Sequence, residues 1–425
     1  MNTFVCDPGT PPSTEQSPLS TPTMKSEVGI TQELPVPVKR VGAADIIGFG
    51  QDGVTILRNT FRPEPRLAIK NFGYNDGWHV EKHVRIVGDT TGNGLADIIG
   101  FGDAGVLVSR NNGNGTFGPP GLALRNFGAD AGGWTNAKHV RYAADLRKKG
   151  FVDLIGFGDA GVFVALNNGN GNFAPAKLVL KDFGYVVGGW KVGRHLRFLA
   201  DTTGDGLPDI VGFGESSVFV SFNNGDGTFQ PVKEVINDFT HATGGWRMDK
   251  HIRTVADLSG DGRVDILGFG EDGVYVALNI GNGTFQPVKH AIQGFGYNNT
   301  WRVGIHPRFV ADTTGDGLGD IVGFGSGGVY VARNNGDGTF ATATIVLYEF
   351  GYDHGWRVDK HPRFLADLTG NGAVDIVGFG EDAVWVSYND GKGNFPAAVK
   401  IATEFAFNDG QWAVDKTVRW VSNMF

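Results

Sequence analysis

The segment GWRVDKHPRFLADLTGNGAVDIVGFGEDAVWVSYNDGKGNF, residues 355–395, contains a tryptophan, a His-x-Arg pair, an Asp- and Asn-rich loop and a glycine-rich DIVGFG core. The same pattern returns along the whole chain. Self-similarity at a fixed period is the signature of a repeat architecture, so the segment is first a building unit. Its core begins at intervals of 52 to 56 residues, at Asp45, Asp97, Asp153, Asp209, Asp265, Asp320 and Asp375.

Each repeat resolves into four short strands. In the fourth repeat we expect them at 195–201, 209–214, 217–223 and 232–239, where apolar or alternating runs lie between Gly, Asn and Asp clusters. Four strands per unit and seven units predict an all-β, seven-bladed β-propeller of four-stranded blades. A stacked solenoid is the second choice, because solenoid repeats are usually shorter and need caps.

The two ends of the chain complement each other. The first repeat has no strand before Asp45, and the C-terminal segment has no GFG core after it. We therefore expect residues 411–422 to supply the innermost strand of the first blade, which would close the ring and remove exposed strand edges. Residues 1–30 are rich in Ser, Thr and Pro and are predicted to be a flexible tail. Residues 31–425 are predicted to form one propeller.

Composition narrows the class of partner. A net charge of −8 without a basic run argues against nucleic acid and against insertion into or binding to an anionic membrane. The single cysteine, Cys6, excludes an internal disulfide framework. No apolar run reaches the roughly 18–20 residues of a membrane span, and no secretory signal is visible at the N-terminus. The expected location is the cytoplasm, or outside the cell by a non-classical route.

A loop in each repeat has the spacing of a cation site. In the fourth repeat, oxygen-bearing side chains occupy positions 1, 3, 5 and 9, and a main-chain carbonyl is available at position 7. Hard oxygen ligands at alternate positions suit Ca²⁺, and no Cys or His is placed for Zn²⁺. The alternative is that these residues only form turns. The candidate ligands are Asp89, Thr91, Asn93, Leu95 and Asp97; Asp201, Thr203, Asp205, Leu207 and Asp209; Asp257, Ser259, Asp261, Arg263 and Asp265; Asp312, Thr314, Asp316, Leu318 and Asp320; and Asp367, Thr369, Asn371, Ala373 and Asp375.

The loops are not equal. Asn93 and Asn371 replace the middle carboxylate in two of them, so these loops should bind calcium more weakly. The third repeat reads DLRKKGFVD and places Arg147 and Lys149 at ligand positions. We expect this loop to hold no metal, with the basic side chains partly replacing the ion. The predicted role of calcium is structural.

A second series of residues lies on the connection between consecutive blades. In an extended strand residues i and i+2 point to the same side, so the His and the Arg of each His-x-Arg pair present together. An aromatic face with a few fixed donors suits a sugar ring, although the tryptophans could equally be packing wedges and the histidines scaffold. The candidate sugar-binding residues are Trp78, His83, Arg85, Trp134, His139, Arg141, Trp190, His195, Arg197, Trp246, His251, Arg253, Trp301, His306, Arg308, Trp356, His361 and Arg363.

The series breaks at the seventh connection. Trp412 and Arg419 are present there, but Thr417 stands in place of histidine. If histidine contributes to ligand contact, at most six sites are expected per chain. No serine recurs beside the histidines, and no paired carboxylate recurs for general acid catalysis, so the chain is predicted not to be an enzyme. A polysaccharide-degrading propeller is a remaining alternative.

The combined pattern resembles a known family. The runs GWRVDKHPRFLADLTGNGAVDIVGFGE and NNGDGTF, with links such as DFGYVVGGW, are similar to the fungal Psathyrella velutina lectin family of seven-bladed propellers with integrin-like FG-GAP repeats. The similarity covers residues 28–425. It implies binding of glycans and glycoproteins with terminal N-acetylglucosamine, and secondarily sialic acid, in pockets between consecutive blades, with calcium in some loops. The third repeat departs from the pattern with TNA at 135–137. A calcium-stabilised protein–protein adhesion propeller of integrin type is the main alternative.

Overall fold

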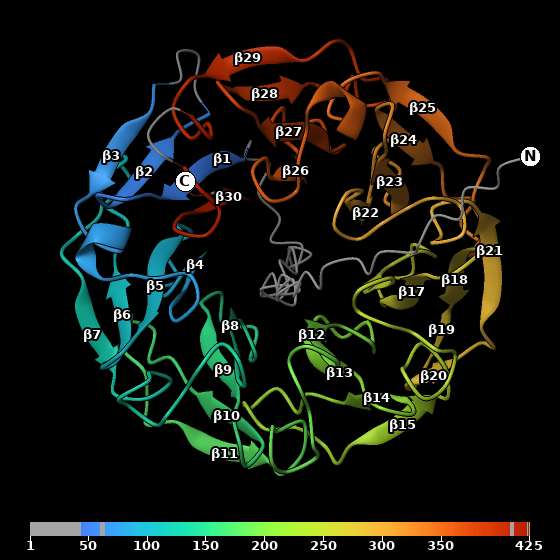
Figure 1. Ribbon diagram of the computed structural model, residues 1–425. Helices are drawn as coiled ribbons and strands as arrows, with labels where there is room; N and C mark the ends of the chain where they lie inside the picture. Colours follow the sequence, from blue (N-terminus) through green and yellow to red (C-terminus); the bar gives the residue numbers. More distant parts are fainter. Residues whose placement is uncertain (1–43, 60–63, 409–411, 423, 425) are drawn as a thin grey trace, which may run out of the picture.

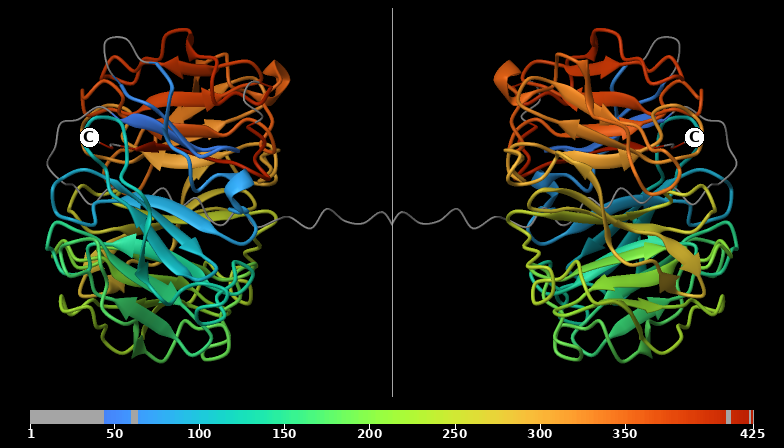
Figure 2. Two further views of the ribbon diagram at one scale, coloured as in Figure 1. Left: turned by 90° about the vertical axis from the view of Figure 1, so that its left-hand side faces the viewer. Right: turned by 90° about the vertical axis from the view of Figure 1, so that its right-hand side faces the viewer.

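The chain forms a closed ring of blades (Figure 1). The computed structural model describes residues 44–59, 64–408, 412–422 and 424. Within these residues the main sheets are seven four-stranded antiparallel blades, so the protein is a seven-bladed β-propeller, as the repeat predicts. The flexible tail predicted for residues 1–30 lies outside the described residues. Figure 2 shows the ring from two sides, with loops on both of its faces.

Each blade runs from an innermost strand near the axis to an outermost strand at the rim (Figure 1). The first blade contains β30 (Val418–Ser422), β1 (Asp45–Phe49), β2 (Val54–Leu57) and β3 (Arg66–Ile69). The second contains β4 (Val84–Gly88), β5 (Asp97–Gly102), β6 (Gly105–Ser109) and β7 (Gly121–Leu124). The third contains β8 (Val140–Ala144), β9 (Asp153–Phe157), β10 (Val162–Ala165) and β11 (Lys177–Leu180).

The remaining blades repeat this order. The fourth contains β12 (Leu196–Ala200), β13 (Asp209–Phe213), β14 (Val218–Ser221) and β15 (Lys233–Ile236). The fifth contains β16 (Ile252–Ala256), β17 (Asp265–Phe269), β18 (Gly273–Ala277) and β21 (Lys289–Gln293), with a separate hairpin of β19 (Asn279–Gly281) and β20 (Thr284–Phe285). The sixth contains β22 (Arg308–Ala311), β23 (Asp320–Phe324), β24 (Val329–Ala332) and β25 (Thr344–Leu347). The seventh contains β26 (Arg363–Ala366), β27 (Asp375–Phe379), β28 (Val384–Ser387) and β29 (Val399–Ala402).

The ring closes as the complementary chain ends predict. Strand β30 pairs antiparallel with β1, so that Asp45 lies opposite Ser422 and Phe49 opposite Val418. Beyond β30, the Met424 carbonyl accepts a hydrogen bond of 2.9 Å from the Asn111 side chain of the second blade. The closing strand therefore joins the last segment of the chain to the first two blades, and both edges of the array are paired.

The glycine of the GFG core is required by packing between blades. The tryptophan of each connection lies on the glycine of the following second strand. A Cβ atom at Gly378 would lie 2.4 Å from the Trp356 ring and 2.5 Å from the Phe350 ring. Phe350 itself has a φ of 59°, in the left-handed region that turns the chain back over the hairpin of its own blade. The repeated Gly, Phe and Trp are thus one packing unit.

Asparagine side chains join neighbouring blades on the loop side. Asn167 Nδ2 donates to the Thr90 carbonyl at 2.9 Å, and Asn279 Nδ2 donates to the Thr202 carbonyl at the same distance. Each contact joins residues 77 positions apart, from one blade to the Asp-rich loop of the blade before it. Because the amides are buried, these bonds satisfy polar groups that water cannot reach and hold the loops in place.

Candidate functional site

The connections between blades position the candidate sugar-binding residues. After the outermost strand of one blade, the chain passes over the turn between that blade's second and third strands and then enters the next blade. In the sixth blade, for example, the Tyr352 amide donates to the Gly325 carbonyl at 3.1 Å. The turn Tyr352–His354 (η2) and its counterpart Tyr74–Asp76 (η1) then lead to the tryptophan and histidine of the next blade.

The tryptophans are mostly buried. Trp78, Trp134, Trp190, Trp246 and Trp412 are 2–6 % exposed, and Trp301 and Trp356 are half-buried. Several indole N–H groups are bonded internally, as in the 3.0 Å bond from Trp246 Nε1 to Asp238 Oδ1. The tryptophans therefore pack in the interior, which is one of the two roles expected from the sequence. Direct contact of their rings with a sugar stays a prediction.

Each histidine is held in one orientation by the chain that precedes it. The main-chain N–H four residues earlier donates to Nδ1, as from Arg357 to His361 at 3.1 Å. An accepting Nδ1 places the proton of the neutral ring on Nε2. That N–H points at the side chain twenty residues further on, just after the GFG core of the same blade.

The residue facing Nε2 is acidic in five blades. The distances from Nε2 to the facing oxygen are 3.2 Å for His83 and Asp103, 3.2 Å for His139 and Asp159, 3.2 Å for His195 and Glu215, 3.4 Å for His251 and Glu271, 3.1 Å for His306 and Ser326, and 2.8 Å for His361 and Glu381. We call each histidine and the residue that faces it a His–acid pair. In the sixth blade a serine takes the place of the acid. In the first blade Thr417 Oγ1 instead donates to the Ala413 carbonyl at 2.9 Å.

The two members of each pair differ in how far they are buried. The histidines are buried, whereas the facing carboxylate side chains are 38 to 54 % exposed. Desolvation lowers the pKa of all six imidazoles, and that of His306 falls to about 4. At neutral pH the rings are therefore uncharged, and His83, His139, His195 and His361 are donors that fix an exposed carboxylate, whereas His251 Nε2 faces Glu271 without a hydrogen bond. An exposed carboxylate held in this way can accept hydrogen bonds from ligand hydroxyl groups.

Basic and aromatic groups surround the acid. Lys82 lies 2.6 Å from Asp103, and Lys250 lies 3.0 Å from Glu271. The Lys250 ammonium also lies 4.3 Å from the centre of the Tyr297 ring. These elements vary between blades, because Ala129 occupies the aromatic place in the second blade and Ile305 the basic place in the sixth.

The arginines of the His-x-Arg series lie deeper, between blades. Each stacks at 5.3–5.8 Å over the GFG phenylalanine of the preceding blade, and Nη1 donates to the carbonyl of the positive-φ phenylalanine, as from Arg85 to Phe72 at 2.9 Å. Burial lowers the pKa of Arg85 to about 10. Among the described residues, neither Nε nor Nη2 of Arg85, Arg197 or Arg419 has a hydrogen-bond partner. Their contacts are those of interblade packing, and a role in binding sugar stays a prediction.

The Asp-rich loops carry oxygen donors of the type calcium prefers, but the carboxylates are bonded within the loop. In the fourth repeat Asp201 accepts from the amides of Thr203 and Gly204, and Asp209 Oδ2 accepts from the Thr202 amide at 3.0 Å. Within the described residues, no group of three or more His, Cys, Asp or Glu side chains converges as a metal cluster. The donor chemistry fits a hard cation, and in this structure Asp205 is exposed and accepts a hydrogen bond from the Leu207 amide.

In the third loop, one of the two basic side chains at ligand positions pairs with a loop carboxylate. Arg147 Nη2 lies 2.7 Å and Nε 3.0 Å from the two oxygens of Asp153, whose carboxylate is fully buried. The guanidinium thus neutralises the carboxylate at loop position 9. Lys149 donates only its main-chain N–H, to Asp145 at 2.9 Å, and its side chain is exposed.

The acidic residues of the His–acid pairs were not among the predicted site residues. They lie in the turn that follows the GFG core. A sequence pattern could have identified them, because each acid lies a constant twenty residues after a histidine. The five acids are Asp103, Asp159, Glu215, Glu271 and Glu381. The turn belongs to the same blade as the strand that the histidine precedes.

Comparison with known proteins places this geometry in a class. Residues 201–268 match the model of the FG-GAP-like repeat family. No curated protein matches the sequence. A solved Agrocybe aegerita lectin, described as specifically recognising non-reducing terminal N-acetylglucosamine, is 58 % identical over 90 % of this chain and 96 % of that chain, with a TM-score of 0.89.

A more distant structure shares only the architecture. A Photorhabdus luminescens Tc holotoxin pore is 17 % identical over 83 % of this chain and 16 % of that chain, with a TM-score of 0.50. The repeat and the ring define an FG-GAP-type β-propeller. The extended identity to the Agrocybe protein shows that the chain belongs to the family of fungal propeller lectins.

Proposed function

We propose that the protein is a multivalent lectin, not an enzyme, that binds terminal N-acetylglucosamine. The observation that carries the proposal is the 58 % identity, over 90 % of the chain, to a lectin described as specific for this sugar. The repeated His–acid pairs support it, because a hydroxyl-rich ligand needs fixed acceptors at the surface. Sialic acid remains a secondary candidate ligand.

The proposed contacts begin at the exposed carboxylates. In the seventh blade, the buried His361 holds Glu381, whose side chain is exposed, and the Lys360 ammonium lies 4.7 Å from the centre of the Phe407 ring. The carboxylate would accept from two sugar hydroxyls, the ammonium would donate to a ring or acetamido oxygen, and the Trp356 and Arg363 packing would keep the connection rigid. Preorganisation of this kind lowers the entropy cost of binding a small ligand.

Multivalency follows from the ring. A single monosaccharide makes few contacts, so each site should be weak, whereas several sites on one rigid body raise avidity on a glycan-covered surface by about 10²–10⁴. We also propose that Ca²⁺ stabilises the Asp-rich loops, supported by their donor set and by the positive charge of Arg147, which pairs with Asp153 in the loop that lacks the full donor set.

Calorimetry with free N-acetylglucosamine tests the function. A stoichiometry above one per chain is expected, with at most six molecules bound at the connections between blades, because six connections carry histidine. A glycan array probed with and without chelator would then compare N-acetylglucosamine with sialic acid ends and separate direct sugar recognition from the effect of calcium. The absence of binding to any array glycan would contradict the proposal.

A further inference from the structure

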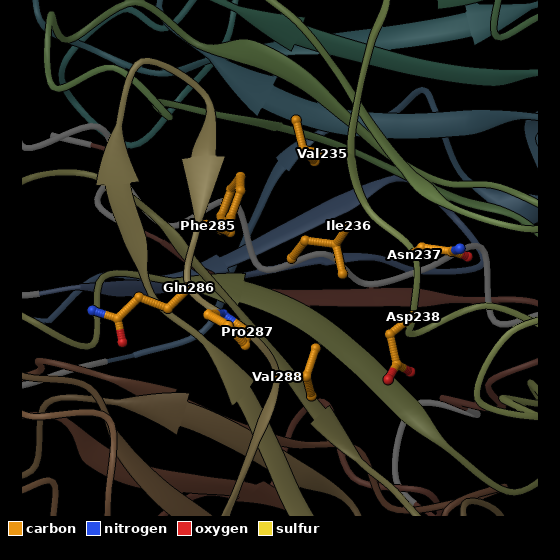
Figure 3. Close-up of a pocket in the computed structure, with 8 residues that line it drawn as sticks. All are labelled: Val235, Ile236, Asn237, Asp238, Phe285, Gln286, Pro287 and Val288. Atoms are coloured by element: carbon orange, nitrogen blue, oxygen red, sulfur yellow. The ribbon is translucent and has the colours of Figure 1, made fainter.

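A groove at the rim of the propeller lies where the fourth blade meets the fifth (Figure 3). Its walls are residues 235–238, which end the outermost strand β15 of the fourth blade, and residues 285–288, which lead from β20 to the outermost strand of the fifth. The cavity volume is about 430 Å³, within the range of roughly 300–1,000 Å³ of ligand pockets. None of its lining residues belongs to a His–acid pair.

The groove combines an apolar surface with a fixed acid. Ile236, Phe285 and Val288 are half-buried and supply apolar surface. Asp238 Oδ1 accepts from the Phe239 amide at 2.5 Å and from Trp246 Nε1 at 3.0 Å. These two bonds fix the carboxylate through one oxygen, and the second oxygen extends the acceptor surface of the groove.

Polar amides complete the two ends of the groove. Figure 3 shows the Asn237 and Gln286 side chains at opposite ends, with Phe285 and Ile236 between them. An apolar face bordered by a carboxylate and by amides that both donate and accept matches a ring with a C–H face and several hydroxyl groups. Because the only ionisable group of the lining is acidic, a neutral ligand is favoured over an anionic one.

One of the two neighbouring blade junctions lacks these groups. At the corresponding positions between the fifth and sixth blades, Gly294 stands in place of Asp238 and Ala341 in place of Gln286.

Between the third and fourth blades, Asp182 and Gln230 occupy the corresponding positions, and Asp182 accepts the same two bonds, from the Phe183 amide and from Trp190 Nε1. Lys181 stands there in place of Asn237, so the combination of an acid with two amides belongs to the groove between the fourth and fifth blades.

We propose that this groove binds one neutral pyranose ring, as a saccharide site separate from the His–acid pairs. The proposal rests on the proposed function to the extent that the ligand is a saccharide. A glycan chain that reaches the rim would then contact the protein at an additional site. This site comes in addition to those predicted from the six histidines.

Hydrogen exchange measured by mass spectrometry, with increasing N-acetylglucosamine, tests the site. We expect slower exchange in peptides that cover 233–239 and 284–290. In Asp238→Asn the concentration for half-maximal protection of these peptides should rise tenfold or more, because the acceptor facing the ligand becomes an amide donor. The fold should be kept, since Asn126 natively makes the same two bonds, to Phe127 at 2.7 Å and to Trp134 at 3.1 Å.

A second variant guards against an indirect effect. Gln286→Ala copies the residue at the junction between the fifth and sixth blades and should also weaken protection of the two peptides, while protection at the turn of Glu381 stays unchanged. Protection at the His–acid turns without protection at the groove would overturn the groove proposal alone, as would unchanged midpoints in both variants. No protection anywhere, together with no heat of binding, would overturn the proposed function as well.

Discussion

His361 Nε2 lies 2.8 Å from Glu381 Oε2, and the imidazole is buried while the Glu381 side chain is 45 % exposed. The buried ring cannot be the main contact surface for a ligand. Its N–H instead fixes the direction of an acceptor at the surface. The pair therefore assigns the histidine a positioning role and the acid the direct contact.

Changing Glu381 to Gln should lower the number of N-acetylglucosamine molecules bound per chain by about one, with the melting temperature nearly unchanged, because the side chain is exposed. His361→Ala should cause the same loss and also reduce the free energy of unfolding by about 1–3 kcal/mol, because a buried hydrogen-bonded ring is removed. Calorimetry and denaturant unfolding measure the two effects. If Glu381→Gln keeps the full stoichiometry, the acid does not contact the sugar.

Removing Arg147 should destabilise the third blade. Arg147→Ala leaves the fully buried Asp153 carboxylate without its ion pair, and the loss of one partner of a buried pair costs about 3–5 kcal/mol. The matched control is Lys149→Ala, because that side chain is exposed and its variant should stay within about 0.5 kcal/mol of the parent. Urea unfolding separates the two cases, and equal stabilities would show that the pair contributes little.

Calcium should stabilise the protein through the loops that keep their middle carboxylate. Asp205→Ala and Asp261→Ala should each lower the melting temperature in calcium and shrink the change caused by a chelator. A ligand that binds only the folded state adds about 2.7 kcal/mol at a hundred times its dissociation constant. Lys149→Ala, in the third loop, should leave the chelator response as it is in the parent. A parent protein that melts identically with and without chelator would refute the calcium proposal.

Acid should destabilise the propeller through its buried histidines. Burial lowers the pKa of His306 to about 4, below the unfolded value of about 6.5, so the unfolded chain takes up the proton first. The contribution of this group is complete above pH 6.5 and is lost as the pH falls toward 4, by about 3 kcal/mol in all.

The control for this pH dependence is His306→Thr, which copies Thr417 at the equivalent place in the first blade. Unfolding free energies at pH 7.5 and pH 5 should differ less in the variant than in the parent. A pH dependence that is identical in the two proteins would assign the acid sensitivity to other groups.

The sequence by itself determined the period, the blade number and the closure. Apolar strands between Gly, Asn and Asp clusters are local signals, and the missing strand before Asp45 had one available partner at 411–422. In the fourth blade the strands end one to three residues inside the expected limits, because hydrogen-bonded pairing stops where the turn residues begin. A compensating role for Arg147 in its own Asp-rich loop could likewise be predicted from residue type and spacing.

Only the tertiary structure decided which side chains reach solvent. Trp, His and Arg recur at each connection, yet the sequence could not distinguish a ring that faces a ligand from one that packs on a glycine of the next blade, as Trp356 does on Gly378. The surface acceptors were identified only from the short distance between each histidine and the side chain twenty positions later. The rim groove was identified only because residues 235–238 lie against residues 285–288 in the structure. The physical reason is that burial and convergence depend on the packing of neighbouring blades, which no local pattern encodes.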